Sequence, residues 1–272
     1  MKKIIFYSLT IFSLFALTAC EVNDSYYVDN IPPDPPAGIE VFNGDNRVDL
    51  SWNENRENDV AGYNVYYSYT YDGKYTLIGS TETNYFIDNG AANGVTYYYA
   101  VTAYDFNGNE SELSYDVIYS TPRPEGFNQA VSDYLNFPDN AGYSFKGYTP
   151  VPYDDENSDF FFENYKGTFY LDVWDDSDIQ DMGTTSDIYD IDYAPLSGWS
   201  HTKDVIAVPG HTYVVWTWDN HFAKIRVKYI TNERVVFDWA YQLVEGNPQL
   251  KAKSVPSERN SRTRLNIRGK SN

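Results

Sequence analysis

The chain has 272 residues, a formal net charge of −19 and a single cysteine. The acidic balance excludes nucleic acid and anionic lipid headgroups as partners of the folded body, because like charges repel. One cysteine forms no internal disulfide, so hydrophobic cores must supply the stability, and 27 Tyr, 15 Phe and 6 Trp provide large side chains for them.

The N-terminal segment, residues 1–19, has the layout of a secretory signal. Lys2 and Lys3 precede an apolar run from 4 to 17 that is too short for a comfortable membrane span. The motif Leu17-Thr18-Ala19-Cys20 resembles the lipobox of bacterial lipoproteins. The resemblance implies cleavage before Cys20, palmitate-type lipid on its thiol and anchoring to a membrane of the bacterial cell envelope, facing the periplasm or the surface. The alternative is an ordinary cleaved signal with a chance cysteine.

Residues 20–36 are predicted to form a tether between the lipid and the first domain. The tether ends in Ile31-Pro32-Pro33-Asp34-Pro35-Pro36. Prolines at this density favour extended polyproline II structure, which acts as a semi-rigid spacer.

From residue 37 to 123, short runs with a period of two alternate with Asn-Gly and Asp-Gly turn signals. This pattern predicts an all-β sandwich of about seven strands. Three segments, 47–52, 60–66 and 94–105, resemble fibronectin type III domains. The resemblance implies that Trp52 lies in the core and that the Tyr97 hydroxyl bonds back to the backbone. It also implies a spacer or interaction module rather than an enzyme.

The turn from Asp105 to Ser111 offers Asp and Asn oxygens that suit calcium. It lacks the closing glutamate of a calcium loop, so a purely structural turn is the competing interpretation.

Residues 124–253 are predicted to form a second antiparallel β-domain. Apolar spacing over Phe127–Leu135 favours a short helix at its start. Strands are expected over Phe160–Phe162 and Thr168–Trp174, joined by a turn at Asn164–Gly167.

An acidic loop follows these two strands and contains Asp175, Asp176, Asp178 and Asp181. Clustered carboxylates suit an oxygen-preferring cation such as calcium, and a pair such as Asp175 and Asp176 suits glycosidase chemistry. The alternative is a solvated acidic surface, because the spacing matches no metal-binding loop.

Three antiparallel strands are predicted over Thr212–Trp218, His221–Ile230 and Arg234–Val244, with Asp219-Asn220 as a two-residue hairpin loop. This loop sets Trp216 opposite Ala223. A three-residue second loop sets Ile225 opposite Trp239, Val227 opposite Phe237 and Arg226 opposite Asp238 as an ion pair. The register groups Trp216, Trp218 and Trp239 on the buried side, which favours a core over a platform for stacking sugars.

The same strands, at 212–217, 222–226 and 235–242, resemble HmuY-like haem-binding lipoproteins of bacterial envelopes. That resemblance implies haem held between two histidines. This chain has His201, His211 and His221, none of which aligns with a family ligand, and the latter two follow turn signals that predict exposure.

Residues 254–272 are predicted to be a basic disordered tail. The sequence contains no His-Glu-x-x-His, no Gly-x-Ser-x-Gly and no phosphate-binding glycine loop. These observations favour a non-enzymatic, envelope-anchored binding protein with a protein or glycan ligand and no cofactor. The alternatives are a haem- or metal-capturing lipoprotein and an accessory polysaccharide-binding or polysaccharide-degrading protein.

Overall fold

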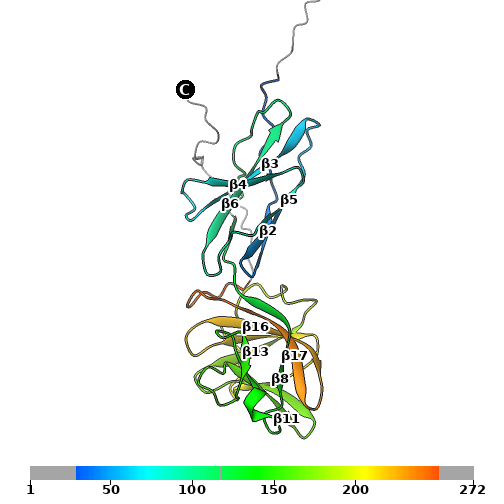
Figure 1. Ribbon diagram of the computed structural model, residues 1–272, viewed down its shortest axis with the longest axis vertical. Helices are drawn as coiled ribbons and strands as arrows, with labels where there is room; N and C mark the ends of the chain where they lie inside the picture. Colours follow the sequence, from blue (N-terminus) through cyan, green and yellow to red (C-terminus); the bar gives the residue numbers. More distant parts are fainter. Residues whose placement is uncertain (1–28, 117, 251–272) are drawn as a thin grey trace, which may run out of the picture.

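The computed structural model describes residues 29–116 and 118–250. The predicted signal, Cys20, the first half of the tether and the basic tail lie outside the described residues. The described chain folds into two antiparallel β-sandwiches that follow one another along the long axis of the molecule (Figure 1). The predicted all-β class is confirmed. Within the described residues, no helix has the length and apolarity needed to cross a membrane.

The first sandwich has the fibronectin type III arrangement, with one sheet in the order β1-β2-β5 and the other in the order β4-β3-β6-β7. Trp52 is 3% exposed and packs edge-on against Tyr63, and the Tyr97 hydroxyl accepts the backbone N–H of Ala92 at 3.0 Å. Both implications of the resemblance are therefore confirmed. The strands are β1 (Glu40–Gly44), β2 (Arg47–Ser51), β3 (Val60–Ser68), β4 (Thr76–Thr81), β5 (Tyr85–Asp88), β6 (Tyr97–Asp105) and β7 (Ile118–Ser120).

The second half of the predicted tether packs on this sandwich. Pro33 and Pro36 are buried, and the backbone N–H of Asp34 donates to Glu57 Oε1 at 2.6 Å. Asn55 Nδ2 donates back to the Asp34 carbonyl at 2.8 Å. Residues 29–36 are thus part of the folded body, and a free spacer ends earlier than the sequence predicts.

The second sandwich pairs a sheet in the order β10-β9-β11-β12-β14 with one in the order β13-β15-β16-β17-β8. Its core is aromatic, and the Tyr143 ring contacts the rings of Phe160, Phe237 and Trp239 between the sheets. The strands are β8 (Glu125–Ser132), β9 (Gly142–Ser144), β10 (Thr149–Val151), β11 (Phe160–Tyr165), β12 (Thr168–Asp172), β13 (Asp178–Thr184), β14 (Asp204–Ile206), β15 (His211–Trp216), β16 (Phe222–Ile230) and β17 (Arg234–Tyr241), with a 3-10 turn, η1 (Pro138–Asn140).

The predicted turn between β11 and β12 is confirmed. Tyr165 pairs with Thr168, and both loop residues have positive φ, Lys166 at 52° and Gly167 at 86°. Positive φ at both positions defines the two-residue type I′ turn of a β-hairpin.

The predicted helix over Phe127–Leu135 is wrong, because this segment forms the edge strand β8 against β17. The register shifts where Trp239 faces Gly126 and Phe237 faces Gln129, which leaves an extra residue in β8. Asn128 has φ 53°, and its backbone N–H bonds to Asp238 Oδ1 at 2.9 Å. Such a bulge interrupts strict alternation, so the apolar spacing imitates that of a helix.

The predicted two-residue loop between β15 and β16 is also wrong. Trp216 pairs with Phe222, so the hairpin closes through Thr217 N–H to the His221 carbonyl at 2.9 Å, around a three-residue loop at 218–220. A two-residue type I′ loop needs positive φ at both positions, and here only Asn220, at 62°, has it. A type I turn followed by one left-handed residue is the usual three-residue solution.

This change moves the side chains of β15 to the opposite faces. Tyr213 and Val215 are fully buried, whereas Trp216 is 37% and Trp218 is 55% exposed. The predicted burial of these two tryptophans is therefore wrong, and only Trp239, at 3% exposed, belongs to the core.

The predicted pairs of β16 with β17 are present, with Ile225 opposite Trp239, Val227 opposite Phe237 and Arg226 opposite Asp238. The predicted three-residue loop is wrong, because Ile230 pairs with Val235 and the Thr231 N–H donates to the Arg234 carbonyl at 2.8 Å, which leaves two loop residues. A register shift between Val227 and Tyr229 makes up the difference of one residue.

Arg226 and Asp238 do not form the expected ion pair. The Arg226 guanidinium donates to the carbonyl of Thr185 at 2.9 Å, and Asp238 pairs with Lys228 at 3.3 Å.

We expect Trp239→Ala to lower the free energy of unfolding by about 3–5 kcal/mol, because it removes a large buried side chain. Trp218→Ala is the matched control and should cost less than about 1 kcal/mol, since its indole is largely in water. Urea denaturation of both variants measures the difference. Equal losses would contradict the three-residue loop.

Candidate functional site

One end of the second sandwich carries an open groove of about 650 Å³. This volume falls in the range of small-ligand sites. Four loops form it: the β9–β10 loop, the β10–β11 loop, the turn after β12 and the β15–β16 loop. We call it the tryptophan groove; its lining residues are Lys146, Asp154, Asp155, Glu156, Asn157, Ser158, Trp174, Asp176 and Trp218.

Trp174 occupies one side of the groove and is 42% exposed. Its indole stacks on Tyr153, with ring centroids 6.3 Å apart and an interplanar angle of 26°, and lies 5.5 Å from the Phe161 ring. The turn beyond it is closed by Ser177 N–H to the Trp174 carbonyl at 2.9 Å. The indole is therefore held in place while part of its surface stays open to solvent.

Trp218 lies in the three-residue hairpin loop and also lines the groove. The loop is held by the Thr217 hydroxyl, which lies 2.6 Å from Asp219 Oδ1 and 3.1 Å from the His221 backbone nitrogen. The sequence pattern does not favour either tryptophan as a ligand-binding residue, because the predicted register buries Trp218 and Trp174 ends a predicted strand.

The polar lining comes mainly from the β10–β11 loop. Asp155 Oδ1 accepts the backbone N–H of Asn157 at 2.8 Å and its side-chain amide at 2.9 Å. These bonds hold the pKa of Asp155 below its ordinary value. The run of Asp, Glu, Asn and Ser at 154–158 has the composition typical of a turn.

Asp159, next to this lining, is 6% exposed. Burial raises its pKa to about 7, although the Phe145 N–H, at 2.7 Å from Oδ2, opposes the rise. The charge of Asp219 raises the pKa further, while His221 and Lys146 lower it. The Asp159 carboxyl therefore changes its protonation state near neutral pH.

The acidic residues predicted from the sequence are separated by the fold. Asp176 lines the groove and Asp175 is exposed in the same turn. Asp178 pairs with Lys203 at 2.9 Å, and Asp181 pairs with His211 at 3.0 Å. In the part of the chain that the structure describes, these four carboxylates do not converge on one cation position.

The three histidines are also apart. His211 begins β15, and His221 follows the hairpin loop at the other end of that strand, paired with Asp219 at 3.2 Å. Their side chains are 24% and 19% exposed, which is less than the sequence predicts, and His201 is exposed in another loop.

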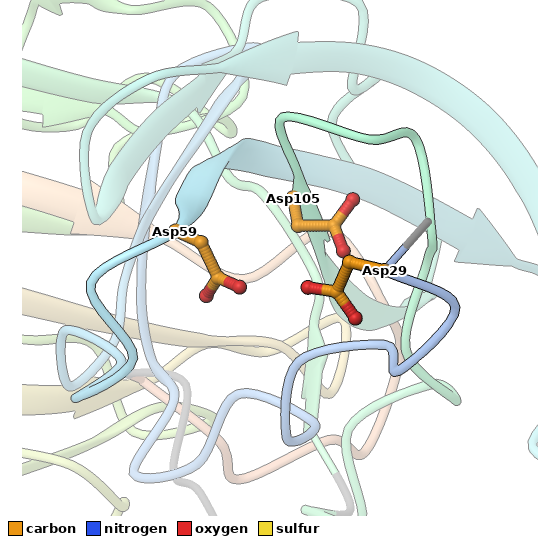
Figure 2. Close-up of side chains that lie close together, drawn as sticks. All are labelled: Asp29, Asp59 and Asp105. Atoms are coloured by element: carbon orange, nitrogen blue, oxygen red, sulfur yellow. The ribbon is translucent and has the colours of Figure 1, made fainter. Parts of the chain in front are cut away.

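A group of three carboxylates comes together on the first sandwich instead. Asp29, Asp59 and Asp105, from three separate segments, turn toward one another, with one oxygen of each within 4.8 Å of the others (Figure 2). Burial raises the pKa of Asp105, but hydrogen bonds from Asn109, Asn107 and Gly108 outweigh it and leave the pKa below its ordinary value. Asp105, which opens the turn considered for calcium, thus has acidic neighbours that sequence spacing does not reveal.

A second groove, of about 580 Å³, lies between the two sandwiches, where Phe42 and Phe127 face Glu125 and Tyr189. Glu125 Oε1 accepts the Tyr189 hydroxyl at 2.9 Å, and the Arg123 backbone N–H donates to the Gly44 carbonyl at 3.2 Å. The Arg123 side chain is fully buried, and its guanidinium has no hydrogen-bond partner among the described residues. This groove therefore lies where the two sandwiches meet.

No family model matches the chain. An amylopullulanase of Thermoanaerobacterium saccharolyticum is 37% identical over 100 residues, which are 36% of this chain and 8% of that protein. Chitinase Chi52 of Paenibacillus xylanexedens is 33% identical over 117 residues, 40% of this chain and 21% of that protein. The chain thus spans a small part of these curated relatives, about the length of one sandwich domain.

Three solved structures each resemble a part of this chain. A fibronectin type III-like protein from Clostridium thermocellum is 32% identical, with a TM-score of 0.27, over 30% of this chain and 85% of that one. A β-1,2-glucanase from Parabacteroides distasonis is 25% identical, with a TM-score of 0.30, over 33% and 13%. A DUF4466 family protein from Parabacteroides merdae is 10% identical, with a TM-score of 0.38, over 74% and 93%.

The raised pKa of Asp159 predicts a pH dependence of stability. Between its ordinary value near 4 and about 7, the folded protein holds a proton that the unfolded chain releases. The contribution is therefore fully present below pH 4 and is lost as the pH rises to about 7. We expect Asp159→Asn to reduce the fall in unfolding free energy between pH 5 and 8, by at most about 3 kcal/mol, since about two pH units separate pH 5 from the raised pKa.

Urea denaturation across this pH range tests the prediction, with the exposed Asp139→Asn as control. Parallel curves for wild type and Asp159→Asn would contradict it.

Proposed function

We propose that this chain is a non-enzymatic, lipid-anchored protein of the bacterial cell envelope, and that its second sandwich binds polysaccharide. The observation that carries the proposal is the tryptophan groove, in which Trp174 and Trp218 expose indole surface beside hydrogen-bonding side chains. A sugar ring has an apolar face that packs on an indole and hydroxyl groups that bond to carboxylates and amides. A groove of this kind therefore suits carbohydrate.

Two further observations support the proposal. The curated relatives named above are an amylopullulanase and a chitinase, whose names refer to polysaccharides. The matched length is a small part of each enzyme, which fits an accessory module better than a catalytic unit. In this chain the fibronectin type III-like sandwich would hold the second sandwich away from the membrane.

The proposed anchor is Cys20, at the end of the lipobox-like motif. A lipid on the thiol removes the problem of a lone cysteine in an oxidising compartment and supplies membrane attachment. The acidic charge of the body gives no electrostatic attraction to anionic headgroups, so attachment would rest on the lipid.

We expect the wild-type protein to be retarded in gels containing amylopectin, pullulan or soluble chitin derivatives, without releasing reducing sugar. Trp174→Ala and Trp218→Ala should each weaken the binding by about tenfold, the effect of about 1.4 kcal/mol. Phe106→Ala, which removes an aromatic ring that is 77% exposed on the first sandwich, is the control. No retardation of the wild type, or equal retardation of the tryptophan variants, would sink the proposal.

We expect cells expressing the full chain to incorporate radiolabelled palmitate and to retain the protein in the membrane fraction. Cys20→Ala should abolish the label and move the protein to the soluble fraction, because no other thiol is present. Ser25→Ala, just beyond the motif, should change neither. Label that persists in the Cys20→Ala protein would contradict the anchor.

A further inference from the structure

We propose that the tryptophan groove selects glycans that carry free amino groups, such as polymers of deacetylated amino sugars. This inference rests on the polysaccharide binding proposed above and narrows its ligand class. It follows from two properties of the same lining, an excess of negative charge and two open indole surfaces.

The charge of the lining is one-sided. Four carboxylates, Asp154, Asp155, Glu156 and Asp176, face a single ammonium group, Lys146. Among the described residues, none of the four carboxylates lies within 4.0 Å of a lysine, arginine or histidine nitrogen. By contrast, Asp178 and Asp181, close by in the sequence, each have a basic partner. The groove therefore keeps a net negative potential that attracts a cationic ligand.

Three of the four carboxylates are open to solvent, where a ligand would meet them. Asp154, Glu156 and Asp176 are exposed, and the hydrogen bonds from Asn157 favour the ionised form of Asp155. A uronic acid or a sulfated sugar would bring like charge into this groove and would be repelled. A neutral sugar would gain only stacking and hydrogen bonds.

An amino sugar uses both properties at once. Its apolar ring face packs on an indole, and its ammonium group pairs with a carboxylate or lies over the face of a second indole. A cation over the face of tryptophan is attracted by the electron-rich ring, also at an exposed site. Trp174 and Trp218 come from different loops and both line the groove. The site therefore offers one indole for the sugar ring and a second for its ammonium group.

A basic peptide would also satisfy the carboxylates. It lacks the flat apolar ring face that two exposed indoles fit, so we favour the glycan. Polylysine therefore serves as a competitor in the test, at equal amine concentration.

The test is titration calorimetry of the full chain with a β-1,4-linked glucosamine hexamer and with the fully N-acetylated hexamer. We expect the free amine to bind at least about tenfold more tightly at low salt and to lose this advantage at high salt, as screening requires. Asp176→Asn and Glu156→Gln should each weaken glucosamine binding by about two- to fivefold, the range of exposed ion pairs, and should weaken binding of the acetylated hexamer less.

Glu82→Gln, an exposed carboxylate on the first sandwich, is the control and should change neither affinity. Equal affinity for the two hexamers, or polylysine competing as well as the glucosamine hexamer, overturns the selectivity. If the two hexamers bind equally but their binding still depends on Trp174 and Trp218, the selectivity for free amines is wrong and the proposed polysaccharide binding stands. Absence of binding to every glycan overturns both proposals.

Discussion

The hairpin between β15 and β16 is the constraint on which the second sandwich and its groove depend. The three-residue loop at 218–220, with Asn220 in the left-handed region, sets Val215 opposite Ala223. This register sends Tyr213 and Val215 into the core and leaves Trp216 and Trp218 outside. A loop shorter by one residue would bury a tryptophan in place of valine, and Trp218 would not face the groove. One left-handed residue thus decides both the packing and the site.

The core and the loops of this domain have different roles. Phe160, Phe237 and Trp239 pack between two five-stranded sheets and fix where the strands end. The loops at one end then carry the groove, as is common for binding sites on β-sandwiches. Trp174 belongs to both parts, because its indole rests on Tyr153 and Phe161 while its remaining surface lines the groove.

The carboxylates of the second sandwich differ in whether they have a basic partner. Asp178 and Asp181 pair with Lys203 and His211 and so stabilise strand ends. Asp154 and Asp176 lie in the groove without such a partner among the described residues. Net charge alone predicts that polyanions are poor partners, whereas the distribution of charge marks the surface where the proposed cationic ligand would bind.

Local patterns alone determined much of this protein. Alternation and Gly-containing turns predicted a first sandwich of about seven strands and the central pairs of β16 with β17, because these depend on a period of two and on turns. The resemblance to fibronectin type III domains implied the roles of Trp52 and Tyr97. Tertiary contacts decided the rest. The bulge at Asn128 turned a helix-like pattern into an edge strand, and the Asn220 loop shifted β15 by one residue. The groove is lined by residues of four loops between residues 146 and 218. Sequence spacing does not predict that these loops lie together, because they do so only when the two sheets pack.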